Sequence, residues 1–299
     1  MLDWHKNIEL LKAGDMKSLA RCISLVENEA PGYEIFMQSL NTNNKGQIIG
    51  ITGPPGAGKS TITDALIGAF TAENKKVAVL CVDPSSPFNL GALLGDRIRM
   101  SEWYNNPNVY IRSLASRGSL GGLNPKIIEI SEIIKAAEFD IVIIETVGVG
   151  QSEIEIAGLA DVTVVVLVPE SGDEIQTMKA GLMEIADIFV VNKSDREGAD
   201  AFINTLKQML APVFHHKQQE IPIVKTIAST KEGIELLKEK INASNKSKVN
   251  DRKSWLLAER AYQLIRSKRM QDVEKSALKT EIEKTEGIIN LYQFIKKYY

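Results

Sequence analysis

The chain has 299 residues, and its 36 lysines and arginines nearly balance its 38 aspartates and glutamates, which leaves a formal net charge of −2. This balance excludes a surface that attracts nucleic acid or an anionic membrane as a whole. A chain of this length can bury a substantial core, and we expect one large domain with appendages rather than two equal domains.

The N-terminus carries an early acid and no apolar signal region, and no apolar run approaches the length of a membrane span. We therefore expect a cytoplasmic protein that has no nucleic-acid or membrane partner. Cys22 and Cys81 form no C-x-x-C pair and fall in regions that read as helix and strand. This predicts buried thiols in a reducing compartment.

Residues 1–45 are predicted to form a helical N-terminal arm. Asp15 precedes an apolar stripe over residues 16–26, and an aspartate at that place can cap a helix by accepting a backbone N–H. The helix should end before Pro31 and Gly32. A polar stretch then separates the arm from the first strand.

Residues 46–245 are predicted to form an α/β domain. Apolar runs at 48–52, 77–82, 141–144, 162–168, 188–191 and 221–224 alternate with longer mixed segments. Continuous apolar strands separated by helices indicate a mostly parallel sheet flanked by helices on both faces. Functional loops of such a sheet lie at the C-terminal ends of its strands.

A glycine-rich loop follows the first of these strands, with the sequence GPPGAGKST, and an apolar helical segment comes next. Such a loop presents backbone N–H groups and a helix N-terminus to a polyanion, Lys59 would reach the β- and γ-phosphates, and Ser60 would bind Mg²⁺. The pattern predicts a P-loop NTPase fold. Its nucleotide-binding residues would be Gly53, Pro54, Pro55, Gly56, Ala57, Gly58, Lys59, Ser60 and Thr61.

Three carboxylates are further candidates for holding Mg²⁺. Glu145 follows the strand at 141–144, and it could instead cap the next helix. Asp83 ends the strand at 77–82, and it could instead form a turn before a proline. Asp96 lies in a candidate first switch, and it could instead pair with a neighbouring arginine on the surface.

The tetrapeptide NKSD at 192–195 follows the strand at 188–191 and has the guanine-reading pattern N-K-x-D. Asp195 would accept hydrogen bonds from the guanine ring N–H and amine, which adenine lacks as a pair. Lys193 would lie along the base, and Asn192 would tie this loop to the P-loop. A backbone loop after the next strand would serve the guanine carbonyl; it consists of Ile227, Ala228 and Ser229.

Hydrolysis needs an oriented water and positive charge around the transferring phosphoryl group. Lys59 supplies part of that charge, and Glu145 would hold the metal. The amide of Gly148 could sense the γ-phosphate, and Gln151 is the nearest side chain that could position water, although it lies two places later than in D-x-x-G-Q proteins. Arginines at positions 97, 99 and 117 could act as an arginine finger or simply form salt bridges. Slow intrinsic hydrolysis is expected.

Residues 246–299 are predicted to form a helical C-terminal region, which a polar linker at 242–248 joins to the domain. Its first helix carries an apolar stripe that includes Trp255, Tyr262 and Ile265. The stripe could pack on its own domain, but the linker favours a partner helix.

Seven segments in order now resemble a known family: GPPGAGKST, VDPSSP, GDRIRM, SRGSLGGL, ETVGVGQSE, GDEIQTMKAGLMEIAD and NKSD. They are similar to those of the metallochaperone-type P-loop GTPases that accompany methylmalonyl-CoA mutase, formerly described as arginine/ornithine transport kinases. The resemblance covers about residues 14–240 and reaches the tail only as a helical dimerisation region. One departure is Ile227, where relatives usually carry serine.

The resemblance implies a Mg²⁺-dependent GTPase that binds GTP and GDP, forms a homodimer, and gates the loading of adenosylcobalamin into an acyl-CoA mutase while protecting that enzyme. It also implies that residues 172–179 act as an additional switch toward the mutase. Two alternatives are a nickel-type metallochaperone GTPase and a P-loop kinase linked to amino-acid transport. The first needs histidine or cysteine clusters, whereas the only histidines are His5, His215 and His216, and NKSD disfavours the second. A third is an assembly factor that holds GTP only as a structural ligand.

Overall fold

The computed structural model describes residues 3–40, 46–83, 100–116, 123–146, 152–171, 183, 185–214, 221–244, 251–270, 272–284 and 290–298. Contacts between Cα atoms divide the chain into two units, Met1–Asn250 and Asp251–Tyr299.

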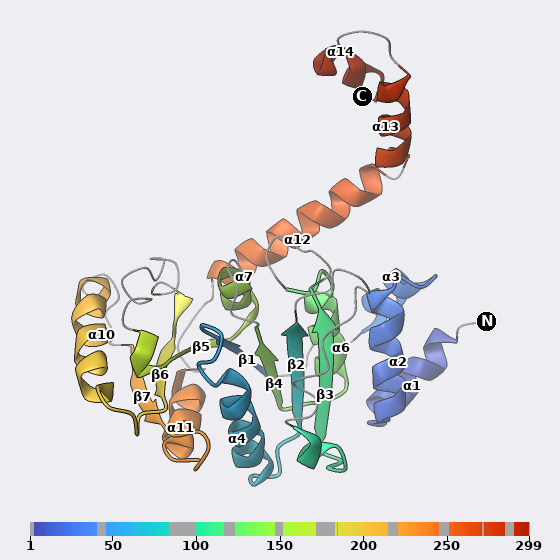
Figure 1. Ribbon diagram of the computed structural model, residues 1–299. Helices are drawn as coiled ribbons and strands as arrows, with labels where there is room; N and C mark the ends of the chain where they lie inside the picture. The colour runs from blue at the N-terminus through green and yellow to red at the C-terminus, as the bar shows by residue number, and fades with distance from the viewer. Residues whose placement is uncertain are drawn as a thin grey trace. The chain divides into compact units, whose positions relative to one another are not determined.

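A seven-stranded sheet forms the centre of the first unit (Figure 1). Its strands are β1 (Gln47–Thr52), β2 (Val77–Asp83), β3 (Val109–Ala115), β4 (Ile141–Glu145), β5 (Val162–Leu167), β6 (Ile188–Asn192) and β7 (Ile223–Thr226). They run in the order β3-β2-β4-β1-β5-β6-β7, and each pairing along this order is parallel. The prediction of a mostly parallel sheet flanked by helices is confirmed.

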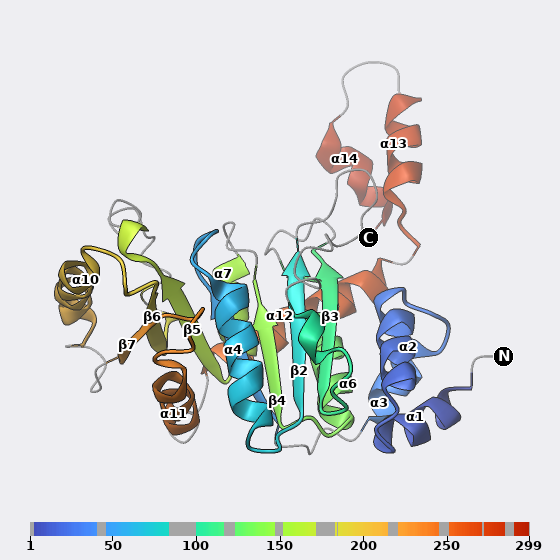
Figure 2. The same ribbon diagram turned by 60° about the horizontal axis from the view of Figure 1, so that its bottom comes forward.

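Helices cover both faces of this sheet (Figures 1 and 2). They are α4 (Lys59–Thr71), α6 (Ile127–Ala136), α7 (Ser152–Leu159), α10 (Ala199–Phe214) and α11 (Ile234–Ser244). Helices α4 and α11 share one core cluster with alternate residues of the central strands, such as Ile49, Val79 and Val164. Residues of α7 and α10 pack with the opposite strand faces, such as Val165 and Phe189, in a second cluster. Burial on both faces explains the continuous apolar strands in the sequence.

Aspartates at the start of three strands fix the register of the sheet. Asp161, just before β5, accepts the N–H of Ile48 at 2.7 Å, and Asp187, just before β6, accepts the N–H of Thr163 at 2.9 Å. Asp140, just before β4, accepts the N–H that precedes β2 at 2.9 Å. Because neighbouring strands are aligned at one end, their C-terminal ends also line up, and these ends carry the candidate site residues.

The N-terminal arm consists of α1 (Trp4–Lys12), α2 (Met16–Glu27) and α3 (Tyr33–Ser39), and α2 packs against α6. Asp15 caps α2 as predicted, because its carboxylate accepts the N–H of Ser18 at 2.7 Å. The hydrogen bonds from Ser18 lower the pKa of Asp15. Cys22, in the middle of α2, is fully buried, and burial raises the pKa of its thiol to about 11.

Strand β3 was not predicted from the sequence. Polar Arg112 and Ser113 interrupt its apolar pattern, because β3 is an edge strand that is only partly buried. The arm neutralises the arginine: Arg112 donates to the Ala20 carbonyl oxygen at 3.1 Å, to the Ser24 hydroxyl at 3.0 Å and to the Glu27 carboxylate at 3.0 Å. An arginine in this strand is therefore a contact to the arm, which no local strand pattern reveals.

The predicted linker at 242–248 starts too early, since α11 continues to Ser244, whose hydroxyl donates to the Lys240 carbonyl oxygen at 2.9 Å; residues 245–250 lie outside the described residues. The second unit contains α12 (Asp251–Arg269), α13 (Lys275–Glu283), α14 (Leu291–Ile295) and a 3₁₀ turn, Lys296–Tyr298. Helix α12 carries exposed Trp255, Tyr262 and Ile265. Among the described residues, no helix is both long and apolar enough to cross a membrane.

Candidate nucleotide and metal site

The P-loop joins the end of β1 to the start of α4, at the C-terminal edge of the sheet. The loop is closely packed at two glycines. Gly53 has a φ of 137°, and a Cβ there would lie 2.1 Å from the Val166 carbonyl oxygen. Gly58 has a φ of 89°, and its Cβ would lie 2.3 Å from the Asn192 side-chain nitrogen. Only glycine fits at these two positions.

Lys59 bends back over the loop that it terminates. Its ammonium donates to the carbonyl oxygens of Gly53 at 2.9 Å and Pro54 at 3.0 Å, and the residue is only 7% exposed. A buried ammonium over a loop of glycine amides is a cationic centre that suits a polyphosphate. Ser60 and Thr61 occupy the first turn of α4, and the N–H groups of a first helical turn point toward the helix N-terminus.

Glu145 ends β4 beside the start of α4. Its Oε1 accepts the hydroxyl of Ser60 at 2.6 Å, and its Oε2 accepts the hydroxyl of Thr63 at 2.9 Å. Glu145 is 5% exposed, so these hydrogen bonds to the P-loop helix are buried. Both of these hydroxyl contacts belong to α4, and residues 147–151, which lead into the next helix, lie outside the described residues, so the capping alternative for Glu145 stays open.

The donor set around Glu145 fits a magnesium ion. A hydroxyl oxygen and a carboxylate are hard oxygen ligands, which Mg²⁺ prefers. Asp83 is the last residue of β2, and Cys81 in that strand pairs with Glu145, so the ends of β2 and β4 lie side by side. Within the described parts of the chain, no cluster of three or more histidines, cysteines, aspartates or glutamates could hold a metal.

Asn192 joins the P-loop to the two loops that follow β6 and β7. Its side-chain nitrogen donates to the Ala57 carbonyl oxygen at 2.9 Å, and its oxygen accepts the Thr226 hydroxyl and the Ala228 N–H, each at 3.1 Å. Asn192 is 2% exposed. The predicted tie between the NKSD loop and the P-loop is thus present as a buried hydrogen-bond network.

Lys193 adds a second link between the same loops. Its ammonium donates to the Gly56 carbonyl oxygen at 2.9 Å, and its backbone adopts a left-handed conformation with a φ of 56°. A lysine in this conformation is uncommon outside functional or turn positions. The stem of Lys193 therefore lies across the gap between the P-loop and the NKSD loop.

A pocket of about 220 Å³ opens between these loops. Its lining residues are Gly58, Thr61, Asn192, Lys193, Asp195, Arg196, Ile227, Ala228 and Ser229. The sequence predictions from three separate segments thus converge on one cavity. Asp195, one of the lining residues, supplies a carboxylate that can accept hydrogen bonds from two ring donors.

Arg196 was not singled out from the sequence, although it lines this pocket. It forms an ion pair with Glu170, in the 3₁₀ turn Pro169–Ser171 after β5, and this hydrogen bond lowers the pKa of Glu170. Thr63 and Thr226 were also missed. Thr63 could have been suspected because it stands three residues after Ser60, on the same helix face, whereas nothing local identifies the partner of Thr226.

Several predicted residues lie outside the described residues: Asp96, Gly148 and Gln151, the arginines at 97, 99 and 117, the segment 172–179, and His215 with His216. The backbone of Asp83 is described as the end of β2, but its side chain is not. The roles predicted for all of these residues stay predictions.

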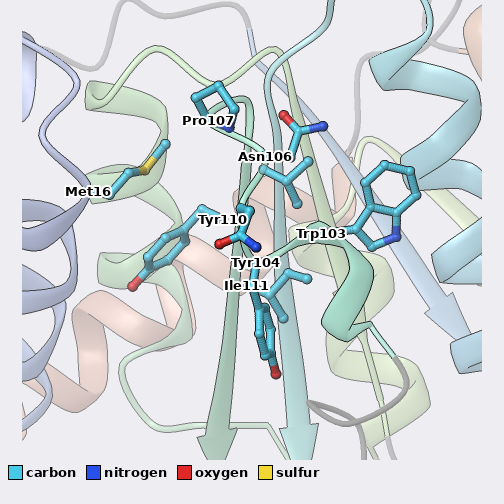
Figure 3. Close-up of a pocket in the computed structure, with 9 residues that line it drawn as sticks. Met16, Trp103, Tyr104, Asn106, Pro107, Tyr110 and Ile111 are labelled. Carbon is cyan, nitrogen blue, oxygen red and sulfur yellow. The ribbon is translucent and has the colours of Figure 1, made fainter.

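Two other described pockets contain none of the candidate residues. One, of about 300 Å³, lies along β3 and is lined by Met16, Trp103, Tyr104 and Tyr110 among others (Figure 3). The indole N–H of Trp103 donates to Asp64 of α4 at 2.7 Å, which ties this part of the chain to the P-loop helix. A larger pocket, of about 730 Å³, lies near the starts of β2 and β4, at the end of the strands opposite the P-loop. Pocket size alone therefore does not identify the site.

The sheet order, the glycine loop between β1 and α4 and the carboxylate at the end of β4 define a P-loop NTPase. The chain belongs to the family described as Methylmalonyl Co-A mutase-associated GTPase MeaB, whose profile matches residues 19–282. The match extends beyond the first unit and into α13.

Individual relatives agree with this family. A protein of Pyrococcus horikoshii named "Putative GTPase" is 48% identical over 244 residues, which cover 80% of this chain and 77% of that one. The Fused isobutyryl-CoA mutase of Geobacillus kaustophilus is 40% identical over 236 residues, which cover 74% of this chain but 22% of that much longer protein. A crystal structure of a LAO/AO transport system kinase superposes with a TM-score of 0.66 at 25% identity, covering 91% of this chain and 86% of that one.

Proposed function

We propose that this protein is a Mg²⁺-dependent GTPase that serves as a chaperone for an adenosylcobalamin-dependent acyl-CoA mutase such as methylmalonyl-CoA mutase. In this proposal it binds GTP, hydrolyses it to GDP and phosphate, and thereby gates loading of the cofactor and protection of the mutase. The observation that carries the nucleotide part is the network in which Asn192 joins the P-loop to the pocket that contains Asp195.

Guanine selectivity follows from the chemistry of Asp195. A carboxylate accepts hydrogen bonds only, and guanine offers an adjacent ring N–H and amine that match its two oxygens. Adenine has no such pair of donors, so ATP would leave the carboxylate desolvated and unpaired. The Ala228 N–H is already bonded to Asn192 and the Ile227 N–H to the Glu232 carbonyl oxygen, so in this proposal the Ser229 N–H would serve the guanine carbonyl.

The phosphate side of the site would work mainly by charge and orientation. The Lys59 ammonium would leave the carbonyl oxygens of Gly53 and Pro54, or share itself with them, to neutralise charge on the β- and γ-phosphates. Ser60 and Glu145 would hold Mg²⁺, which when bound supplies further positive charge to the transferring phosphoryl group. Gln151 would position the water, and Gly148 would report the γ-phosphate.

The partner part of the proposal is supported by the family and by one relative. The family description names methylmalonyl-CoA mutase, and a fused isobutyryl-CoA mutase contains a segment similar to most of this chain. Fusion of a GTPase segment to a mutase favours physical association in the unfused protein. We further propose that residues 246–299 mediate a homodimer, supported by the exposed Trp255, Tyr262 and Ile265 of α12.

Two variants test the nucleotide assignment. Lys59→Ala should abolish hydrolysis, because it removes the buried cation of the P-loop. Asp195→Asn should shift the preference of the purified protein from GDP to XDP, since xanthine presents one donor and one acceptor where an asparagine amide offers the complement. Release of phosphate from GTP measures the first effect, and equilibrium binding of GDP, XDP and ADP by calorimetry measures the second. Binding of ADP as tight as that of GDP to the wild-type protein would refute guanine selectivity.

A capture experiment tests the mutase. The full-length protein is immobilised with a non-hydrolysable GTP analogue and exposed to a lysate of the source cell, with Lys59→Ala as the matched control. We expect the wild-type protein with the GTP analogue to recover a cobalamin-dependent mutase. The Lys59→Ala variant should not recover it. Equal recovery by both proteins would overturn the switch mechanism, and reproducible absence of a mutase would overturn the partnership.

A further inference from the structure

The buried hydroxyl of Thr63 contacts the Glu145 carboxylate at the oxygen that does not bond Ser60. Glu145 Oε1 accepts from Ser60 at 2.6 Å, and Oε2 accepts from Thr63 at 2.9 Å. Thr63 is completely buried, and the carboxylate lies between the two hydroxyls. The two oxygens of Glu145 are therefore distinguished by their partners, one from the P-loop residue Ser60 and one from a residue outside the P-loop pattern.

Helix geometry brings both hydroxyls to the same carboxylate. Ser60 and Thr63 are three residues apart on α4, so they lie on one face, one turn from each other. Strand β4 places Glu145 opposite this face, because it pairs with β1, from which the P-loop starts. The contact thus depends on the register between two adjacent strands, and on no flexible segment.

The donation by Thr63 differs from what a threonine usually does in a helix. Threonine commonly returns its hydroxyl proton to the carbonyl oxygen four residues earlier. Thr71, on the same helix, does this and bonds the Ile67 carbonyl oxygen at 2.8 Å. A hydroxyl has a single proton, so donation to Glu145 by Thr63 takes the place of that local bond. The branched side chain also restricts rotation about χ1 and holds the hydroxyl in this direction.

We propose that Thr63 is a positioning residue for the magnesium site: it holds Oε2 of Glu145 so that Oε1 faces Ser60 and the metal. The proposal rests on the proposed function. Without the hydroxyl, the carboxylate can rotate and its second oxygen loses a buried donor. The free energy of Mg²⁺ binding would then include the cost of orienting Glu145. The affinity for Mg²⁺ would fall, while the P-loop and the base pocket stay intact.

The test separates metal affinity from nucleotide affinity. Binding of a fluorescent GDP analogue to the full-length protein is measured in EDTA and over a Mg²⁺ titration, for the wild type, Thr63→Val, Thr63→Ser and the matched control Thr71→Val. For Thr63→Val we expect unchanged GDP affinity in EDTA and a Mg²⁺ requirement raised by about tenfold or more, the scale of one lost hydrogen bond to a charged group. Thr63→Ser, which keeps the hydroxyl, should stay within about threefold of the wild type. Thr71→Val should not change the Mg²⁺ requirement.

The outcomes distinguish the inference from the function on which it rests. If the wild type binds GDP and responds to Mg²⁺ but Thr63→Val has the same Mg²⁺ requirement, the inference is wrong and the proposed function stands. If the wild type binds no guanine nucleotide, the proposed function itself fails. Should Thr63→Val not fold, Thr63→Ser and Thr63→Ala replace it, and equal Mg²⁺ requirements for these two would overturn the inference. In a Glu145→Gln background, Thr63→Val should have no further effect, and an additive loss would also contradict it.

Discussion

The network around Asn192 predicts a large effect of a single substitution. In Asn192→Ala, three buried groups lose their partner: the Ala57 carbonyl oxygen, the Thr226 hydroxyl and the Ala228 N–H. An unpaired buried polar group costs roughly 1–3 kcal/mol, and the three share one small region, so we expect a loss of roughly 2–5 kcal/mol in the free energy of unfolding. GDP affinity should fall by about tenfold or more, because the P-loop and the base pocket are no longer held together.

Urea unfolding followed by circular dichroism measures the first effect, and calorimetry with GDP measures the second. Ser194→Ala is the matched control, because Ser194 lies in the same loop and donates a single hydroxyl bond to the Thr226 carbonyl oxygen at 3.2 Å. Its loss should stay within about 1 kcal/mol. If Asn192→Ala unfolds at the same urea concentration as Ser194→Ala and binds GDP like the wild type, the network does not hold the site together.

Two further substitutions test the packing and the charges of the first unit. Gly58→Ala places a Cβ 2.3 Å from the Asn192 side-chain nitrogen at a φ of 89° and should abolish GDP binding. The control Gly198→Ala, at a φ of 85° with nothing within 4 Å of the Cβ, should cost only the backbone strain of about 1 kcal/mol. Equal effects of the two variants on GDP binding would show that the contact with Asn192 is irrelevant. In Glu155, burial in α7 raises the pKa of the carboxyl above 4.5, so the stability that its proton contributes is present at acid pH and is lost as the pH rises through the folded pKa. Glu155→Gln should therefore unfold at a higher temperature than the wild type at pH 7 and at a similar one at pH 4, and a gap that does not change with pH would contradict this account.

Much of the site could be predicted because it consists of backbone patterns with fixed chemistry. A glycine loop between a strand and a helix binds phosphate for reasons that are local in sequence, and N-K-x-D after a strand is equally local. The convergence of Asn192 on Ala57, across 135 residues of sequence separation, followed from the rule that parallel strands end at one edge. The apolar strands were recognisable because both of their faces are buried.

What the sequence concealed depends on contacts between distant segments. Strand β3 is an edge strand whose Arg112 serves the arm, so its pattern resembles a loop. Thr63 belongs to the site through Glu145, and its spacing from Ser60 is the only local sign of this; Arg196 lines the base pocket and pairs with Glu170, which no spacing rule reveals. The end of α11 was missed because Asn242 and Ser244 are weak helix formers that tertiary packing of Ile241 nevertheless keeps in the helix.

The position of β1 explains how one short loop can serve both halves of the site. In the sheet, β1 lies between β4, which carries Glu145, and β5, which is followed by β6 with Asn192. The P-loop that leaves β1 therefore contacts Glu145, on the proposed metal side, through Ser60 and contacts Asn192, on the proposed base side, through Ala57. A strand at the edge of the sheet would have only one neighbour and could reach only one of the two sides. Ser60 and Ala57 are three residues apart, so a single short turn carries both the contact to Glu145 and the contact to Asn192.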